Sequence, residues 1–339
     1  MIWDDIEVQE IDLKNPRQTS EIQAFLQGFE LDYPGNTDYT AAFYNTAGEL
    51  AATGSLAKNV LRNIAVAESL QGEGMTASVV SHLLREAAAR GFYHCFLFTK
   101  PEKAVQFSAL GFREIARADS LAMLMETGVG SIEQFQRELL LQAGNLPAGR
   151  RAALVMNCNP FTLGHKALVE RASRENDAVV VLVVSEDQSV FPFTDRLRLV
   201  QQGLAEYRNV IVLPSGPYVV SAATFPGYFT KGGDTVRAQT RLDADLFGRW
   251  IAPALGVSRR YIGEEPYSEV TRQYNEALLE VLPAYAIEVT VMPRRKAGDE
   301  IISASRVRQS IAEGDWEAVR RMVPDSTYAY LKAPAAMLY

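Results

Sequence analysis

Cysteine, histidine and long apolar runs are all scarce in this chain of 339 residues. The two cysteines, Cys95 and Cys158, are too few for a disulfide framework or a cysteine-rich zinc site, and they fit a reducing compartment. The longest apolar run, Ala178 to Val184, falls far short of the roughly 20 residues that a membrane-spanning helix needs. The first residues are acidic, whereas a signal peptide is basic and then apolar. These observations predict a cytoplasmic protein with no membrane partner.

Positive charge is also in deficit, since 34 Lys and Arg stand against 41 Asp and Glu and leave a formal net charge of −7. A nucleic-acid-binding domain neutralises phosphates with clustered basic residues, so this balance argues against a nucleic-acid partner. The charge balance is still compatible with a small anion bound at one basic spot. The 47% hydrophobic and 22% charged residues are typical of a globular protein, and at roughly 150 residues per domain the length predicts two domains.

Short strands and helices follow one another irregularly in the first half of the chain. Strands are expected at 39–44, 50–56, 60–66, 92–99, 112–116 and 121–125, and helices at 75–90 and 101–110. Turn residues between the first three strands favour antiparallel pairing. We therefore expect an α+β domain over residues 1–127, followed by a linker with one helix over 128–150, where glycines and a proline loosen the chain.

From residue 151 on, strands and helices alternate in the way that is typical of a parallel, doubly wound sheet. Strands are expected at 152–156, 178–184, 210–213, 261–263 and 287–292, and helices at 164–176, 194–206 and, as the last helix, 303–313. Ligands of such sheets bind at the carboxyl ends of the strands. The prediction for residues 151–339 is an α/β Rossmann-like domain.

The stretch from Val155 to Lys166 holds a strand end, a turn and a helix start. Free backbone amides and the positive end of the helix dipole make such a junction an anion site. A hydroxyl, a glycine that leaves room and an imidazole N–H would all help to bind a phosphate there. The candidates are Asn159, Thr162, Gly164, His165 and Lys166. The structural alternative is that His165 only caps the helix and that Cys158 is simply packed.

Thr162-Leu163-Gly164-His165 resembles the (H/T)-x-G-H box of nucleotidyltransferase-type adenylating proteins, in its Thr variant. Their second box opens a late helix and is similar to residues 302–308, with Ala304 in place of a Ser and Ser305 in place of a Thr. In such proteins the two boxes face each other across the phosphates of ATP. The resemblance implies Thr162 and His165 near the reacting phosphorus and Ser303, Ser305, Arg306 and Arg308 at the other phosphates, with His165, Thr162 and Arg308 as the catalytic residues.

In the first half, the segment 71–76 resembles the (Q/R)-x-x-G-x-(G/A) pyrophosphate loop of the GNAT acetyltransferases, which makes Gln71 and Gly74 binding candidates. Phe107 stands where that family has a tyrosine general acid, and a phenyl ring has no proton to give. The fold implied for the whole chain is an α+β GNAT-like domain followed by an α/β nucleotidyltransferase-like domain. We expect the first domain either to bind a coenzyme-A-like arm or to be a structural relic.

This order of two halves resembles the citrate lyase ligase family over nearly the full length. The stretches that carry the resemblance are 157–165, 191–196, 221–226, 263–268, 271–275 and 302–308. It implies an AMP-forming enzyme that uses ATP, with Mg²⁺ whose ligands stay unassigned, to convert acetate into acetyl-adenylate. The acetyl group then passes to the thiol of the prosthetic group on the citrate lyase acyl carrier subunit. Residues 221–224 and 263–267, with Gly263 and Glu264, are expected around adenine, ribose or acetate.

Two other functions use the same boxes. A nucleotidyltransferase would join a nucleotide to a phosphorylated small molecule such as pantetheine phosphate or glycerol phosphate. A sensing module would bind a nucleotide or an acyl-CoA without reaction. Acetate-dependent exchange of labelled pyrophosphate into ATP separates these functions, because a phosphate-acceptor enzyme would not respond to acetate.

Overall fold

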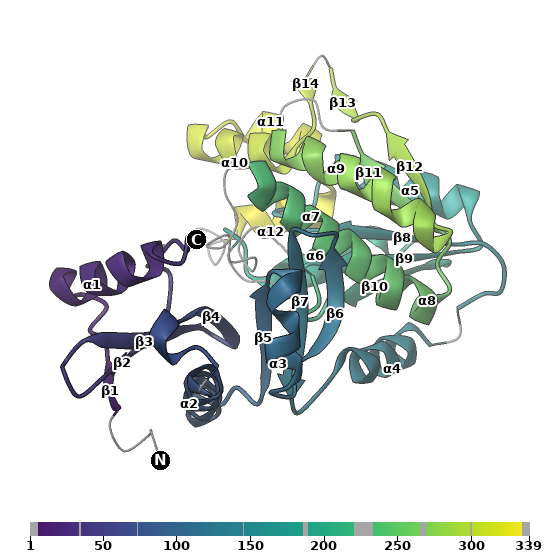
Figure 1. Cartoon of the computed structure of the whole chain (residues 1–339). Coiled ribbons are helices and arrows are strands. Elements are labelled where there is room, and N and C mark those ends of the chain that lie inside the picture. Colours follow the sequence, from purple (N-terminus) through teal and green to yellow (C-terminus); the bar gives the residue numbers. More distant parts are fainter. Residues whose placement is uncertain are drawn as a thin grey trace. The chain divides into compact units, whose positions relative to one another are not determined.

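The computed structural model describes residues 6–33, 35–72, 74–144, 146–185, 189–219, 233–264, 269–298 and 300–333. The described residues fall into two compact units (Figure 1). One unit comprises the residues up to 131 together with 233–242, and the other comprises 132–219 and 243–333. Each unit closes its own hydrophobic core.

A seven-stranded sheet forms the first unit, in the order β1-β2-β3-β4-β5-β7-β6. Neighbouring strands are antiparallel, except that β4 and β5 run parallel. The strands are β1 (Glu7–Glu10), β2 (Tyr39–Tyr44), β3 (Leu50–Ala57), β4 (Val60–Val66), β5 (His94–Thr99), β6 (Arg113–Ala118) and β7 (Ala122–Gly128). The helices are α1 (Pro16–Gln27), α2 (Met75–Ala89) and α3 (Ala104–Ser108), with 3₁₀ turns η2 (Glu68–Leu70) and η3 (Pro101–Lys103). The α+β organisation expected for this half is confirmed.

Helix α2 packs directly on the backbone of the sheet. It begins after Gly74, whose φ of 84° is a left-handed conformation that glycine adopts without strain. Its buried residues Val79 and Leu83 recur at helical spacing. A Cβ at Gly54 in β3 would lie 2.7 Å from a Val79 methyl, so the absence of a side chain at residue 54 sets the distance between helix and strand.

The two parallel strands of this sheet separate early. β4 and β5 pair at only two positions, Val60 with Phe96 and Leu61 with Leu97. A cavity of about 480 Å³ lies beyond these pairs, lined by residues 64–66 of β4 and 97–99 of β5. The start of α2 also lines it, so a helix N-terminus borders the opening between the strands.

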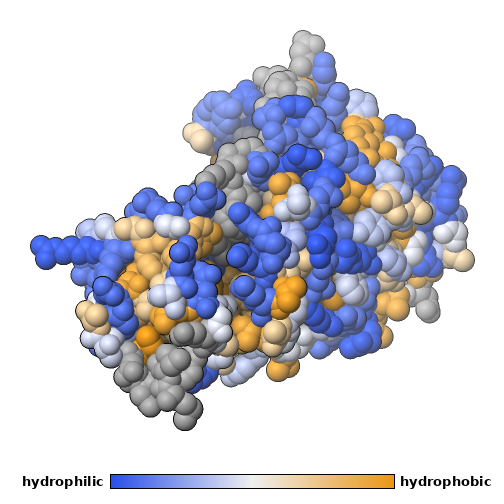
Figure 2. All heavy atoms as spheres, in the orientation of Figure 1, coloured by the Kyte–Doolittle hydropathy of each residue, from blue (hydrophilic) through white to orange (hydrophobic). Residues whose placement is uncertain are grey.

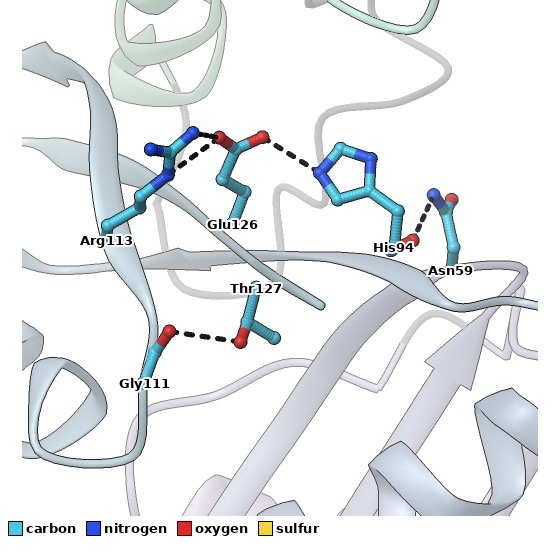
Figure 3. A network of polar contacts seen from close by, with 6 residues as sticks. All are labelled: Asn59, His94, Gly111, Arg113, Glu126 and Thr127. Carbon is cyan, nitrogen blue, oxygen red and sulfur yellow. Dashed lines mark hydrogen bonds and ion pairs between the residues drawn. The ribbon is translucent and has the colours of Figure 1, made fainter. Parts of the chain in front are cut away.

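A buried carboxylate connects the last three strands of the sheet (Figure 3). Glu126 on β7 is 1% exposed, and its Oε2 lies 2.8 Å from His94 Nε2 on β5. Arg113 on β6 donates from Nε to Glu126 Oε1 over 2.9 Å. Another histidine of this unit, His82 on α2, has its Nε2 at 2.6 Å from the Tyr39 hydroxyl oxygen. Both histidines therefore contribute to internal hydrogen bonds of the first unit.

A five-stranded parallel sheet forms the centre of the second unit, in the order β10-β9-β8-β11-β12. The strands are β8 (Arg151–Met156), β9 (Ala178–Val183), β10 (Val210–Pro214), β11 (Arg259–Gly263) and β12 (Glu288–Met292), with a small pair β13 (Lys296–Ala297) and β14 (Glu300–Ile301). The helices are α4 (Ile132–Ala143), α5 (Leu163–Glu175), α6 (Phe193–Leu204), α8 (Ala252–Leu255), α9 (Glu269–Val281), α10 (Ala304–Glu313), α11 (Trp316–Met322) and α12 (Asp325–Lys332). Helix α7 (Gly233–Leu246) belongs to both units, since its residues 233–242 are grouped with the first and the rest with the second. A π-helical turn η5 (Phe247–Ile251) joins α7 to α8, and a 3₁₀ turn η6 (Leu282–Tyr285) follows α9. The expected parallel α/β sheet is confirmed.

The end of the chain holds more helix than expected. Helices α11 and α12 follow α10, so the expectation that 303–313 is the last helix is wrong. Both are short, of 7 and 8 residues, and offer too few turns for a clear helical repeat. Tertiary packing stabilises them, because Val319 and Leu331 are buried in one cluster with Val307 of α10.

Strand β8 lies at the point where the order of the sheet reverses. The chain goes from β8 to β9 on one side, and β11 later pairs with β8 on the other side. Open parallel sheets bind ligands in the crevice at the carboxyl ends of such strands. The residues that follow β8 and β11 are therefore in the position where a ligand site is expected.

Hydrophilic side chains cover most of the molecular face drawn in Figure 2, and hydrophobic ones form small groups. No helix within the described ranges is both long enough and apolar enough to cross a bilayer.

The loop after β8 packs closely against helix α6. Phe161 is fully buried, and its ring packs against Gly203 of α6. A Cβ at Gly203 would lie 2.5 Å from the ring. A side chain at this position would have to displace the ring under the predicted phosphate-binding segment.

We expect Gly203→Val to lower the free energy of unfolding by about 2–3 kcal/mol, because the added methyl groups overpack a full core. Urea denaturation measures the effect, with Gln202→Ala on the exposed side of the same helix as the matched control. A variant as stable as the wild type would show that the ring has room to move.

Candidate active site

The two predicted phosphate-binding segments meet at one cavity of about 250 Å³. Gly164 and His165 line it from the start of α5, and Ile302 and Ser303 line it from the residues before α10. The two segments lie close together, since a Cβ at Gly164 would be in van der Waals contact with the Ile302 carbonyl oxygen, 3.4 Å away. Segments that are more than a hundred residues apart in the sequence thus share one concave site.

Thr162 and His165 form a reciprocal cap at the start of α5. The Thr162 backbone N–H donates to His165 Nδ1 over 3.1 Å, and the His165 backbone N–H donates to the Thr162 hydroxyl oxygen over 3.3 Å. A ring nitrogen that accepts a hydrogen bond carries no proton, so the neutral imidazole holds its proton on Nε2. Phe161 stacks on the ring at 5.9 Å between centroids and 12° between planes. The ring is therefore fixed in both tautomer and orientation.

His165 is neutral at physiological pH. Burial, and then the positive charge of Arg294, lower the pKa of its imidazole from 6.5 to about 4. A neutral ring whose Nδ1 is already engaged offers an Nε2–H donor and takes up no proton. Such a group donates to a phosphoryl oxygen without adding a buried positive charge.

The Thr162 side chain is itself part of the cap that orients His165. Thr162 is 1% exposed, and its hydroxyl oxygen lies 3.0 Å from His165 Nδ1. The structure therefore places this hydroxyl in the cap of α5. The role that follows most directly from these contacts is to position His165.

The second segment is capped and tied to the first. The Ser303 hydroxyl oxygen accepts from the Arg306 backbone N–H over 3.1 Å and caps α10. Arg308 donates from Nη1 to the Asn159 carbonyl over 2.5 Å and from Nη2 to the Ser305 hydroxyl over 3.3 Å. Ser303 lines the cavity, whereas Asn159, Ser305 and Arg308 form a bridge between the two segments beside it.

Two basic candidates, Lys166 and Arg306, form ion pairs outside the cavity lining. Lys166 Nζ lies 2.5 Å from Glu206 Oε1, and it also lies over the Tyr207 ring. Arg306 Nη1 lies 3.5 Å from Glu313 Oε2. Neither basic side chain is among the described residues that line the cavity. Lys166 does not line the cavity although His165 does, because each residue of a helix is rotated by about 100° from the one before it.

The carboxyl end of β11 also lines the cavity. Gly263 lines the cavity, and its carbonyl accepts from Asn275 Nδ2 of α9 over 2.9 Å. The Glu264 carbonyl accepts from Arg294 Nε over 2.7 Å, so Glu264 holds a cavity-lining arginine through its backbone. The candidate stretches 221–224 and 265–267 lie outside the described residues.

Arginines that no motif identifies also line the cavity. Arg294 and Arg295 follow β12, and Arg260 lies within β11. The run Arg294-Arg295-Lys296 directly after a strand was an available signal for the first two, because the chain as a whole is acidic. No comparable signal marks Arg260, since its burial depends on elements that are distant in the sequence.

A buried arginine organises the ends of β8 and β9. Arg196 is fully buried and donates to the carbonyls of Asn157 over 2.8 Å, Val184 over 2.9 Å and Phe191 over 3.0 Å.

Burial raises the pKa of the Cys158 thiol, which lies near Arg196. The residue therefore stays a packed thiol, in agreement with the structural alternative for it.

The GNAT-like loop borders the separate cavity of the first unit. Gln71 and Gly74 line it, and Gln71 Nε2 donates to the Val66 carbonyl over 3.1 Å. Lys100 and Lys103 are also part of its lining. Phe107 faces this cavity and packs edge-on against Phe112, so the position of the usual general acid carries no hydroxyl.

Comparison with known proteins agrees with this geometry. The family model described as the citrate lyase ligase C-terminal domain matches residues 151–331. The [citrate [pro-3S]-lyase] ligase of Klebsiella pneumoniae is 37% identical over 94% of both chains. That of Haemophilus influenzae is 34% identical over 93% of this chain and 96% of its own. The chain belongs to the citrate lyase ligase family.

An acetyltransferase of the GNAT family from Staphylococcus aureus covers 37% of this chain and 99% of its own length, at 16% identity and a TM-score of 0.32.

We expect His165→Gln to reduce the acid sensitivity of folding. Between about pH 6.5 and 4 the unfolded chain takes up a proton at this imidazole while the folded chain does not, so the wild type loses stability as the pH falls. Glutamine still accepts from the Thr162 N–H but does not titrate. Urea denaturation at pH 6.5 and pH 4.5 should show a loss smaller by about 1–2 kcal/mol in the variant. An equal loss in both proteins would contradict a neutral imidazole in the folded chain.

Proposed function

We propose that the chain activates acetate with ATP and transfers the acetyl group to the thiol of the prosthetic group on the citrate lyase acyl carrier subunit. The observation that carries this proposal is the single cavity shared by the starts of α5 and α10, with a neutral His165 beside it. Membership of the citrate lyase ligase family supports the choice of reaction.

In the first step an acetate oxygen attacks the α-phosphorus of ATP and pyrophosphate leaves, which gives acetyl-adenylate. Negative charge grows on the phosphoryl oxygens as the P–O bond to pyrophosphate breaks. The His165 Nε2–H, the Ser303 side of the cavity and the backbone amides at the start of α5 stabilise this charge. Arg294 and Arg295 add positive charge to the lining of the cavity.

In the second step the thiolate of the carrier attacks the acyl carbon of acetyl-adenylate. The C–O bond to the phosphate breaks, AMP leaves, and the acetyl group is bound as a thioester. The nucleophile belongs to the partner, since the Cys158 thiol of this chain is buried and its pKa is raised.

Magnesium enters this reaction with ATP. The described lining of the cavity contains no Asp or Glu, and the described part of the chain brings no three His, Cys, Asp or Glu side chains together as a metal site. No residue of the chain is therefore assigned to Mg²⁺, and no step is derived through it. The proposal places the enzyme in the cytoplasm, in line with its two cysteines.

We expect His165→Ala to lower kcat for acetate-dependent exchange of labelled pyrophosphate into ATP by about 10²–10³, the cost of one lost donor to a developing oxyanion. The matched control is Arg174→Gln on the exposed side of the same helix, which should leave kcat unchanged. An unchanged kcat in His165→Ala would show that this imidazole is only a cap.

The choice of acid decides between the candidate functions. Formate, acetate, propionate and citrate are compared in parallel, and a selective response to acetate is expected. Exchange that responds to pantetheine phosphate or glycerol phosphate, but not to acetate, would favour a nucleotidyltransferase. Binding of ATP without any exchange would favour a sensing module.

We also propose that the first-unit cavity binds the coenzyme-A-like prosthetic arm of the carrier. Its supporting features are the opening between β4 and β5, the start of α2 and the two lysines Lys100 and Lys103, which suit a pyrophosphate next to an apolar arm. Phe107 argues against acetyl transfer within this cavity, because it has no proton to donate.

We expect Ala77→Trp, which fills this cavity from α2, to raise the KM for the acyl carrier subunit at least tenfold. The exchange of pyrophosphate into ATP should not change, because it needs no carrier. Ser81→Trp on the exposed side of α2 is the matched control. An unchanged KM in Ala77→Trp would favour a structural relic.

A further inference from the structure

One side-chain oxygen of the active-site cavity lacks a hydrogen-bond donor. Asn275 of α9 lines this cavity and is half-buried. Its Nδ2 donates to the Gly263 carbonyl at the end of β11 over 2.9 Å, and no described group donates to its Oδ1. This Oδ1 is not one of the fully buried atoms without a partner, so it keeps accessible surface. An acceptor is therefore available at the cavity wall.

The Gly263 carbonyl fixes the direction of this amide. The oxygen and nitrogen ends of an Asn side chain are alike in size, but a backbone carbonyl can only accept a hydrogen bond. The atom of Asn275 that faces it must therefore be Nδ2. Because β11 has neighbouring strands on both sides, this carbonyl is a rigid anchor. The Oδ1 of the planar amide is then held in one direction.

Other polar groups of the lining are donors or are already in use. Arg294 and Arg295 carry only donors. The amide of Asn157, which also lines the cavity, is engaged at both ends. Its Oδ1 accepts from Arg196 Nη1 over 2.8 Å, and its Nδ2 donates to the Ser189 hydroxyl over 3.1 Å. A lining rich in donors suits the phosphates of a nucleotide, whereas the acceptor on α9 suits a group that donates.

Apolar side chains adjoin the anchor of the Asn275 amide. Met292 of β12 pairs with Gly263 in the register of the two strands. A Cβ at Gly263 would be in van der Waals contact with Leu168 of α5, 3.4 Å away. Both apolar residues line the cavity, as does Ile262. Apolar walls with one fixed polar group suit a planar base, whereas a sugar would leave hydroxyls without partners there.

We propose that Asn275 accepts a hydrogen bond from the 6-amino group of adenine and thereby selects ATP over nucleotides with a 6-oxo base. This inference rests on the use of ATP in the proposed function. Apart from its ribose hydroxyls, the 6-amino group is the donor that ATP offers, and it matches the oriented Oδ1. Guanine and hypoxanthine have an acceptor at that position, so two oxygens would face each other, both desolvated and without a hydrogen bond.

The test measures nucleotide binding to the full chain by calorimetry, without acetate so that no reaction proceeds. ATP is compared with purine riboside triphosphate, which lacks the 6-amino group. We expect the wild type to bind ATP about tenfold more tightly, the effect of one hydrogen bond to a desolvated acceptor. In Asn275→Ala the ratio of the two Kd values should fall to about one, because the acceptor is gone.

The ratio separates base recognition from a structural role. Loss of the bond to the Gly263 carbonyl weakens both nucleotides alike and leaves the ratio unchanged. Glu276→Ala is the matched control, because Glu276 is the next residue of α9, is exposed and pairs with Arg272. This control should keep the wild-type preference.

The outcomes distinguish this inference from the proposed function. A preference retained in Asn275→Ala, or a wild type that binds both nucleotides equally, would overturn the role of Asn275 alone. A wild type with the expected preference, but with pyrophosphate exchange that does not depend on acetate, would overturn the proposed function alone. Binding of neither nucleotide would overturn both. Should Asn275→Ala fail to fold, Asn275→Leu, which has a similar branched shape and no acceptor, should lose the preference in the same way.

Discussion

The reciprocal cap between Thr162 and His165 is the interaction on which the proposed chemistry depends. It occupies Nδ1 of the imidazole, so the proton of the neutral ring must lie on Nε2. Burial and the nearby Arg294 then keep the ring neutral by lowering its pKa. A residue that would otherwise be a titrating surface group becomes a fixed donor at the start of a helix, where the backbone already favours an anion.

The structural and the functional interpretations of this residue are therefore compatible. A cap was the alternative to a catalytic role for His165, and the structure shows that the cap is present. The cap also fixes the direction of Nε2, the other nitrogen of the ring. Because capping uses one nitrogen and phosphate binding would use the other, a test of function must measure kcat as well as stability, and a test of the cap must measure the pH dependence of unfolding.

The second unit supports this site with arginines in different roles. Arg196 donates to three carbonyls and holds the loops after β8 and β9, and Arg308 bridges the two phosphate-binding segments. Arg260 is buried between the Phe247 ring and Tyr274. Their protein acceptors make Arg196 and Arg308 parts of the architecture that holds the site together.

Much of this protein follows from local sequence patterns. The strand and helix repeats predicted an α+β half and a parallel α/β half, because the periodicity of apolar residues reflects which face is buried. The two boxes predicted a phosphate site, because strand-turn-helix junctions expose backbone amides wherever they occur. Other features depend on contacts between distant residues. Lys166 pairs with Glu206, Arg260 lies under Phe247, and α11 and α12 are stabilised by packing on α10. Side-chain direction and burial are set by neighbours that the fold brings close, and no local pattern contains them.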